Sequence, residues 1–359
     1  MPVLVPLFDI YLGSCKLRAF KQIKVKLSRL LPCDSAEINL PFLADTDLGK
    51  LKKNGVVSGG QVEIALGWDG VDPEIVFSGV ITKVSPEQPL KITCADHGQA
   101  LKETYLDKKT FSQKKEGPLG AEESWYSEIA HYVISKAGLT PVIPNTHDES
   151  EGDIKRKSFS VDAQTPAQVL EKLRESGWDF FVIPGTKKCY FGPPWPYARG
   201  ILKQDKLFRY AFEALKNQGH IIAAPIIEPK SLTFTPADKV GKVIVHLTDA
   251  DFVKPAVTAE FGDGKPVKEY SFTDSEISEN KARIRARNLF LKLNSTTVKG
   301  EIKVFGNQFI KHSEQIIVRD PKHQERGGAD MRLWLDEVTH LISPTEGFRT
   351  FLKLCLAKQ

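Results

Sequence analysis

Two stretches of this chain, one near each end, share the pattern of a β-hairpin with a Ser-Pro corner. Residues 80–86 read Val-Ile-Thr-Lys-Val-Ser-Pro and lead into Leu-Lys-Ile at 90–92. Residues 338–344 read Val-Thr-His-Leu-Ile-Ser-Pro and lead into Leu-Lys-Leu at 352–354. Proline lacks the amide donor that a strand ladder needs, so each Ser-Pro marks the end of a paired strand. One hairpin type used twice predicts two similar β-barrels separated by other material, although short hairpins also resemble one another by chance.

Length and composition indicate a globular protein with more than one domain. A single core stops growing near about 250–300 residues, and this chain has 359. Hydrophobic content of 41% and charged content of 26% are those of an ordinary soluble protein. The net charge of +5 is spread over short clusters such as residues 155–157, which are more typical of solvated faces than of a nucleic-acid site.

The cysteines and the N-terminus give no sign of export. The five cysteines are odd in number, and no C-x-x-C occurs, so neither a zinc site nor a disulfide framework is indicated. The first residues lack the basic start and apolar core of a signal peptide. The longest apolar run, residues 221–227, is far shorter than the roughly 20 residues that cross a bilayer. We therefore expect synthesis in a reducing cytoplasm and no membrane insertion by this chain.

The first half of the chain divides into a strand-rich region and a mixed region. Clean alternation at residues 23–27, with apolar and basic residues on opposite faces, is typical of a half-buried strand. The polar run 103–123 is interpreted as a linker or mobile loop. Thr165-Pro166-Ala167-Gln168 predicts a helix start with a capping box, and an aromatic-rich hairpin is expected over 178–191.

The second half is less clear before it becomes strand-rich again. Leu207, Ala211 and Leu215 could line a helix, whereas the prolines at 225 and 229 suggest a crossing segment. The predicted fold class is β-rich α+β, with two similar β-barrels separated by a small α+β module. The expected divisions are 1–104 for the first barrel, 105–197 for a linker and the α+β module, 198–230 for a connecting segment, and 231–359 for the second barrel with one helix at 281–293.

Three sequence blocks carry a resemblance to a known family. These blocks are Gly67-Trp68-Asp69-Gly70 through Ile81 with Leu90 to Asp96, then Thr165 to Phe191, then the helix from Lys281 through Gly306 to Val338-Thr339-His340 and Gly347 to Leu352. In this order they resemble the baseplate hub proteins of contractile phage tails, the late-control protein D family, which is related to the hub part of type VI secretion spike proteins and of tailocins. The sequence departs from the family pattern after Asn307, where an expected glycine is absent, and in the long polar segments 105–123 and 140–157.

The resemblance implies a structural tail hub. In such hubs two similar barrels per subunit form a ring of six in a homotrimer, which joins a sixfold tail tube to a trimeric central spike and encloses a channel for DNA or effector passage. The implied partners are further copies of the chain, a spike protein, a tail tube or tube-initiator protein, baseplate wedge proteins and a tape-measure protein. The second barrel runs to the last residue, so we expect the spike to be a separate protein. The implied location is the tail baseplate of a virion, after synthesis in the host cytoplasm. Gly79 and Gly306 are predicted to sit at strand bends that assembly needs.

The sequence predicts no catalytic, cofactor-binding or metal-binding residues, and so no enzyme. No H-E-x-x-H, G-x-S-x-G, Walker A or G-x-G-x-x-G pattern occurs. His246 and His340 are interpreted as histidines on strand faces. Asp336 and Glu337 are adjacent in a strand, so they point to opposite faces and cannot flank one glycosidic bond.

Two alternative functions remain open from the sequence. A nucleic-acid- or glycan-binding β-barrel could use a basic strand face such as Lys24 and Lys26, and binding that weakens with salt would identify it. A peptidoglycan hydrolase is the less favoured alternative, which clearing of purified cell walls would identify. Trp195 follows two prolines and precedes a third, and we interpret it as a surface residue that touches a partner.

Overall fold

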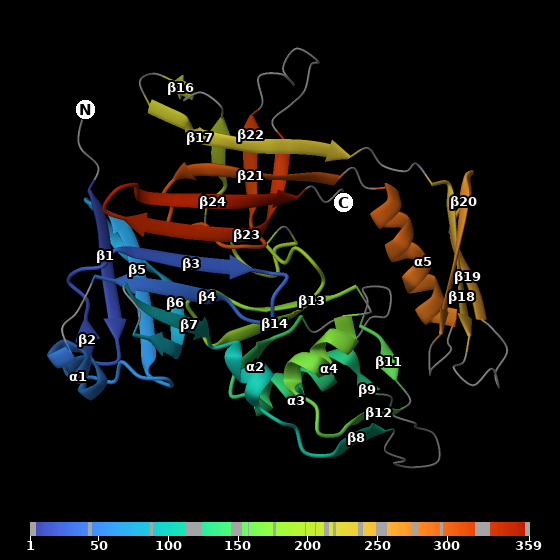
Figure 1. Ribbon diagram of the computed structural model, residues 1–359. Helices are drawn as coiled ribbons and strands as arrows, with labels where there is room; N and C mark the ends of the chain where they lie inside the picture. The colour runs from blue at the N-terminus through green and yellow to red at the C-terminus, as the bar shows by residue number, and fades with distance from the viewer. Residues whose placement is uncertain are drawn as a thin grey trace.

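The computed structural model is dominated by one fourteen-stranded sheet that curls into two adjoining bodies (Figure 1). The remaining strands form two- and three-stranded sheets. No helix within the described residues combines the length and apolar character needed to cross a bilayer. The structure describes residues 5–41, 45–86, 89–112, 124–144, 153–156, 158–174, 177–197, 199–204, 206–211, 215–217, 220–235, 240–248, 257–273, 279–294, 297–319 and 331–355.

The first body, here called the half-barrel, contains strands β1 to β7. In β3 the buried side chains of Ile23, Val25 and Leu27 alternate with lysines, which confirms the predicted half-buried strand. Its elements are β1 (Pro6–Leu12), β2 (Cys15–Lys16), β3 (Gln22–Ser28), β4 (Ser35–Leu40), α1 (Asp45–Lys53), β5 (Gln61–Trp68), β6 (Val71–Ser85) and β7 (Leu90–Asp96).

The second body, here called the closed barrel, is a ring of six strands. The pairings run β15–β22–β23–β24–β21–β17 and return from β17 to β15. The short strand β16 pairs with β17. The elements are β15 (Phe208–Ala211), β16 (Leu215–Asn217), β17 (His220–Thr235), β21 (Thr297–Phe305), β22 (Gln315–Arg319), β23 (Met331–Ser343) and β24 (Gly347–Cys355).

The two bodies share one strand order, which supports the duplication predicted from the hairpins. If the barrel strands of each body are numbered along the chain, the half-barrel uses β1, β3, β4, β5, β6 and β7, and the closed barrel uses β15, β17, β21, β22, β23 and β24. In both sheets the order is first, fourth, fifth, sixth, third, second. The repeated hairpins, β6–β7 and β23–β24, occupy the same two places in this order.

The half-barrel differs from the expected closed barrel because its sheet remains open. In the part of the chain that the structure describes, no pairing joins β1 to β3, although β15 and β17 make the corresponding contact in the closed barrel. The free side of β3 pairs instead with β23 of the closed barrel. The prediction of a β-rich α+β fold is confirmed, with one closed and one open barrel-like sheet.

A small α+β module lies between the two bodies in sequence. Thr165 caps α4 as predicted, because its Oγ1 accepts the Gln168 N–H at 3.3 Å and the Gln168 side chain accepts the Thr165 N–H at 2.9 Å. The elements are α2 (Gln99–Glu103), β8 (Lys109–Ser112), β9 (Ser124–Trp125), α3 (Tyr126–Lys136), β10 (Thr140–Val142), β11 (Lys155–Arg156), β12 (Ser158–Val161), α4 (Pro166–Leu173), β13 (Asp179–Val182) and β14 (Lys188–Gly192).

Two local predictions were wrong. The expected linker at 103–123 contains strand β8, which pairs with β12, while residues 113–123 lie outside the described part of the chain. The helix that Leu207, Ala211 and Leu215 could line, one of two alternatives for this segment, does not form, because 208–211 and 215–217 are strands of the closed barrel. Pairing with other strands decides these segments, and the spacing of apolar residues within one segment cannot report it.

Some of the residues that the sequence analysis assigned to the second barrel instead form a separate unit, which lies between β17 and β21 in the chain. Strand β18 pairs antiparallel with β19 and parallel with β20, and helix α5 covers the buried face of this sheet with Ala282 and Ala286. Figure 1 shows this unit beside the main sheet. Helix α5 also packs Ile284 against the core of the α+β module. The elements are β18 (Lys242–Thr248), β19 (Val257–Gly262), β20 (Val267–Thr273) and α5 (Glu279–Asn294).

Candidate functional site at the junction of the two barrels

The junction is formed by β3 and β23, which pair antiparallel along residues 23–28 and 337–342. Strand β23 changes neighbour along its length, because its residues 331–334 pair with β22 before the later residues pair with β3. A register shift around Asp336 marks the change. Both bodies also contribute to one hydrophobic core, so ladder and core are continuous across the junction.

Arg29, which directly follows β3, links the two barrels and the α+β module. Its Nε donates to Asp336 Oδ1 at 2.7 Å, and its Nη1 donates to Asp179 Oδ2 at 2.8 Å. Arg174 completes the group by donating to Asp179 Oδ1 at 3.2 Å and to the Arg29 carbonyl at 3.2 Å. Burial opposes the charge of Arg29, but the carboxylates of Asp179 and Asp336 outweigh it and raise the pKa of Arg29. These ion pairs fix the relative placement of three units.

Trp195 packs against this junction and is partly buried there. Its ring lies 5.0 Å from that of Trp334 on β23, centroid to centroid. The Arg29 guanidinium lies 4.1 Å from the Trp195 ring centroid, which is cation–π geometry. Trp195 therefore has an internal contact while part of it stays exposed, and its contact with a partner stays a prediction.

A second contact joins the barrels at Trp68, at the end of β5. Its Nε1 donates to the Gly306 carbonyl at 2.8 Å, and its ring lies 5.6 Å from that of Phe348. A Cβ on Gly306 would come within 2.1 Å of the Phe348 ring, and one on Gly79 would come within 2.1 Å of a backbone carbonyl of β7. The sequence predicted that both glycines lie at strand bends. In the structure each glycine lies so close to a neighbouring group that a larger side chain would not fit without a shift.

Three titratable side chains meet in the interior beside the junction. Asp34 and Asp96 of the half-barrel and His312 of the closed barrel are almost fully buried. Asp34 Oδ2 lies 4.0 Å from His312 Nε2, and neither atom has a hydrogen-bond partner among the described residues. Burial and the Asp96 charge raise the pKa of Asp34, and burial raises that of Asp96 to about 7. Burial, reinforced by nearby cations, lowers the pKa of His312 to about 3, so all three side chains favour their neutral forms.

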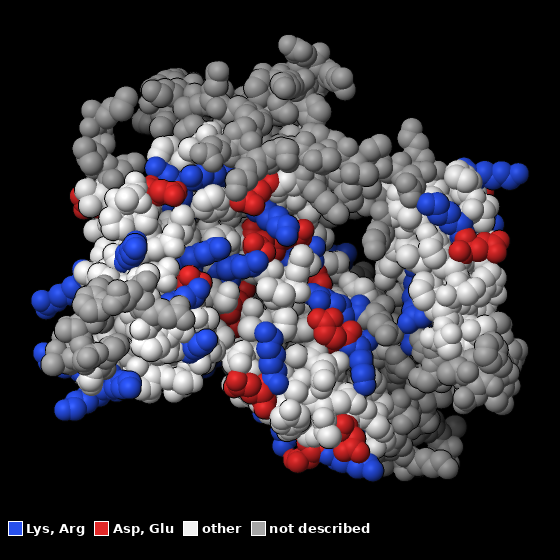
Figure 2. Space-filling view, in the orientation of Figure 1, with Lys and Arg blue, Asp and Glu red and all other residues white. Residues whose placement is uncertain are grey.

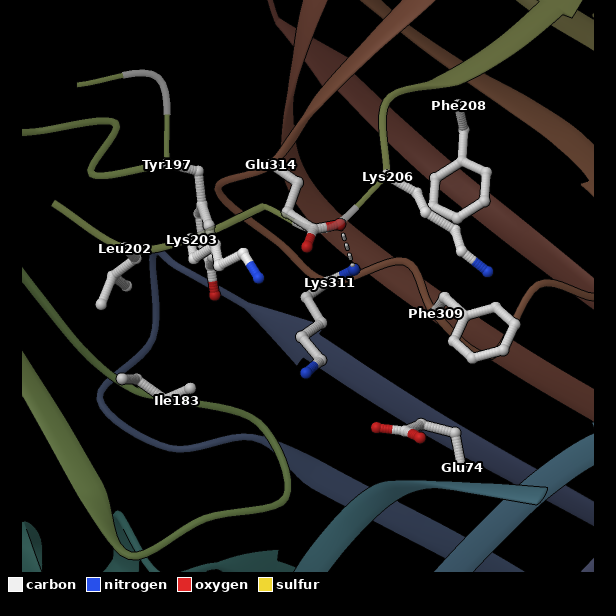
Figure 3. A pocket seen from close by; sticks show the side chains of 10 residues that line it. All are labelled: Glu74, Ile183, Tyr197, Leu202, Lys203, Lys206, Phe208, Phe309, Lys311 and Glu314. Carbon is white, nitrogen blue, oxygen red and sulfur yellow. Dashed lines mark hydrogen bonds between the residues drawn. The ribbon is translucent and has the colours of Figure 1, made fainter. Parts of the chain in front are cut away.

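A pocket with a volume of about 340 Å³ opens where the half-barrel, the segment before β15 and the closed barrel meet (Figure 3). Lys203, Lys206 and Lys311 surround it together with Glu74 and Glu314. The rest of its lining is apolar or aromatic, from Ile183, Tyr197, Leu202, Phe208 and Phe309. The pocket therefore combines positive charge with apolar walls.

The outer face of the joined sheet carries both signs of charge (Figure 2). Lys26 on β3 pairs with Glu337 on β23 at 2.9 Å, and Lys91 on β7 pairs with Glu37 on β4 at 2.7 Å. Lys24 stands opposite Glu37 in the strand register. The expected basic strand face is therefore a mixed-charge face, which is poorly suited to a phosphate backbone.

The described residues offer no group of three or more His, Cys, Asp or Glu side chains placed to hold a metal ion. His340 is fully buried on β23, beside Thr350, and burial lowers its pKa to about 4. Asp336 pairs with Arg29 inside the junction, whereas the adjacent Glu337 pairs with a lysine on the outer face. The two acids therefore point to different places, as predicted from strand geometry.

The fold is similar to solved structures of tail proteins. The tail protein from Neisseria meningitidis MC58 matches with a TM-score of 0.64 and 12% identity over 98% of this chain and 97% of that chain. The 43 kDa tail protein of prophage MuSo2 from Shewanella oneidensis matches with a TM-score of 0.61 and 12% identity over 97% of each chain. A chain of the Francisella PdpA–VgrG complex matches with a TM-score of 0.56 and 9% identity over 99% of this chain and 53% of that chain.

Comparison by sequence identified no family for this chain. No protein-family model matches it, and no curated protein matches it. The likeness to solved structures at such low identity concerns the fold, and it confirms at that level the resemblance to phage tail hubs drawn from the three sequence blocks. The chain has the fold of phage tail proteins.

Sequence reasoning missed the residues of the junction. Arg29 stands 150 positions from Asp179 and 307 positions from Asp336, and no local pattern connects them. The pairing of β3 with β23 likewise leaves no periodic signal beyond two ordinary strands. The one available signal was Arg29 itself, a charged residue directly after an alternating strand.

Proposed function

We propose that this chain is a structural hub of a phage-type tail, which joins a sixfold tail tube to a trimeric central spike. The observation that carries the proposal is the strand order shared by the two bodies, in a chain with the fold of tail proteins. Two similar bodies in each of three subunits present six similar surfaces to a tube and three identical ones to a spike. We assign the chain no catalytic role.

The proposed homotrimer repeats between chains the kind of contact seen within the chain. Inside the chain the second strand of the half-barrel, β3, pairs with the fifth strand of the closed barrel, β23. The equivalent contact between chains joins the second strand of the closed barrel, β17, to the fifth strand of the next half-barrel, β6. Among the described residues, 226–235 of β17 pair with β21 alone and 83–85 of β6 pair with β7 alone, so both strands have an open edge there.

The remaining partners follow from this placement in a tail baseplate. The ring would receive a tail tube or tube-initiator protein on one face and a separate spike protein on the other, with wedge proteins outside and a channel for DNA or effector inside. A tape-measure protein would contact the face of the ring that receives the tube. The similarity to a chain of a PdpA–VgrG complex supports the association with a spike. The proposed location is the baseplate of a virion, and the late-control protein D family is the proposed relation.

Mass photometry of the purified protein, alone and with its spike protein, tests the proposal. A species three times the 40.1 kDa chain mass is expected, at least in the presence of the spike. Cross-linking of that species should join residues of β6 in one copy to residues of β17 in another. A monomer or dimer in both samples would contradict the hub assignment.

A further inference from the structure

The pocket beside the junction holds a cation without an acidic partner. Lys311 is half-buried, and Figure 3 shows its side chain extending into the cavity. No ion pair joins its ammonium group to Glu74 or to any other described residue, while its backbone N–H donates to Glu314 Oε2 at 3.0 Å. A partly buried ammonium group is less well solvated than one in bulk water, so a counter-charge in this pocket is favourable.

The charges around the cavity favour an anionic occupant. The three lysines stand against Glu74 and Glu314, and Glu314 is itself nearly buried in the wall. The Lys206 ammonium lies 4.4 Å from the Phe309 ring centroid, so this aromatic ring is already covered by a cation. The lining therefore carries three ammonium groups against two carboxylates beside apolar surface, and its formal charge is positive.

We propose that this pocket binds an acidic, partly apolar peptide segment of a partner protein. Carboxylate side chains of the segment would pair with Lys311 and its neighbours, because a charge-assisted hydrogen bond is about twice as strong as a neutral one. Apolar side chains between the acids would contact Ile183 and Leu202. The volume of about 340 Å³ is at the lower end of the range for small binding sites and accommodates a few side chains but not a folded element.

The lining argues against nucleic acid as the occupant. A phosphate backbone needs a basic groove that follows it over several nucleotides, with rings free for base stacking. Here the basic residues surround a confined pocket, two carboxylates line it, and the Phe309 ring is covered by the Lys206 ammonium group. The inference uses the pocket alone and does not depend on whether the chain forms a trimer.

Fluorescence anisotropy with three labelled probes tests the inference. The probes are a peptide that alternates glutamate and leucine, the same peptide with glutamine in place of glutamate, and single-stranded DNA of similar contour length. The glutamate peptide should bind the full-length chain, more weakly at higher salt, and the variant K203Q/K206Q/K311Q should weaken binding by about tenfold or more. The double variant K203Q/K206Q, which changes two exposed side chains, should weaken it to a lesser degree with no effect on folding.

A matched control separates pocket binding from general charge. The variant K50Q/K52Q/K53Q removes the same amount of charge from α1, outside the pocket, and should bind the glutamate peptide as the parent chain does. The inference is overturned if the glutamate peptide does not bind, if the pocket variants bind it as tightly as the control, or if the glutamine peptide binds equally well. DNA binding that is as tight and is lost in the same pocket variant would also overturn it.

Discussion

Replacing Asp96 by asparagine should remove part of the pH dependence of the free energy of unfolding. Burial raises the pKa of Asp96 from its ordinary 3.8 to about 7, so the native state holds this proton more tightly than the unfolded state does. The resulting stabilisation is complete below about pH 4 and is lost as the pH rises toward 7. The wild-type protein therefore becomes less stable over this range because a carboxylate must form in the interior, where the cost of burial outweighs the nearby Lys102 charge.

The magnitude follows from the difference between the two pKa values. A rise from 3.8 to about 7 corresponds to about 4 kcal/mol, since a tenfold change in proton affinity is worth about 1.4 kcal/mol. Between about pH 5 and pH 7 the wild-type protein should lose about 2 to 3 kcal/mol through this group. The pKa of Asp34 is raised in the same direction by burial and by the Asp96 charge, so a slope of the same sign remains in Asp96→Asn. The double variant Asp34→Asn/Asp96→Asn should show a still smaller change of the free energy of unfolding with pH.

Urea unfolding followed by tryptophan fluorescence, repeated from about pH 5 to pH 8, measures this dependence. Asparagine is uncharged, and its oxygen can still accept the Gly98 N–H that Asp96 Oδ1 accepts at 2.9 Å. The variant Asp263→Asn, at an exposed turn, is the control and should keep the wild-type slope. An Asp96→Asn protein whose stability falls with pH as steeply as wild type would refute the reasoning.

Three further substitutions test the junction and the module. Arg29→Met should lower the free energy of unfolding by about 3 kcal/mol, because it removes the cation of the partly buried Asp336 and one of the two cations of Asp179, and hydrogen exchange should rise at β13 and β23. Gly306→Ala should destabilise by about 1–3 kcal/mol because its Cβ meets the Phe348 ring, whereas Gly49→Ala, with open space around its Cβ, should not lower the melting temperature. Thr165→Ala should cost about 1 kcal/mol in urea unfolding by removing the cap of α4, and an unchanged midpoint would count against the capping box.

Local features of the fold could be predicted from the sequence because their causes are local. The alternation in β3 and the cap at Thr165 each depend on residues within a few positions of one another. The repeated Ser-Pro hairpins also pointed correctly to a duplication, since the ends of both strands, Ser85 and Ser343, are equivalent in the shared strand order.

The failures share one physical cause, which is pairing or packing with other segments of the chain. Spacing along Leu207, Ala211 and Leu215 fits a helix, yet β15 pairs with β17 and β22, and β16 pairs with β17. The separate sheet of β18, β19 and β20 looks in sequence like further barrel strands, because alternation reports one buried face but not which core covers it. The junction site was invisible for the same reason, since its ion pairs connect three units of the chain.

In the proposed trimer the two kinds of contact between barrels need not be equally strong. Aligning the two hairpins places Ser78 of β6 at the position of Asp336 of β23, and Ser78 Oγ lies 3.2 Å from His97 Nε2. The acid that pairs with Arg29 inside the chain therefore has no acidic counterpart at the equivalent place between chains. A buried, hydrogen-bonded arginine pair adds specificity to a contact, so the interchain contact should be the weaker of the two. A hub built this way would be stable as a folded subunit and would close into a ring when a threefold partner holds three copies together, which confines ring formation to the place where the spike is present.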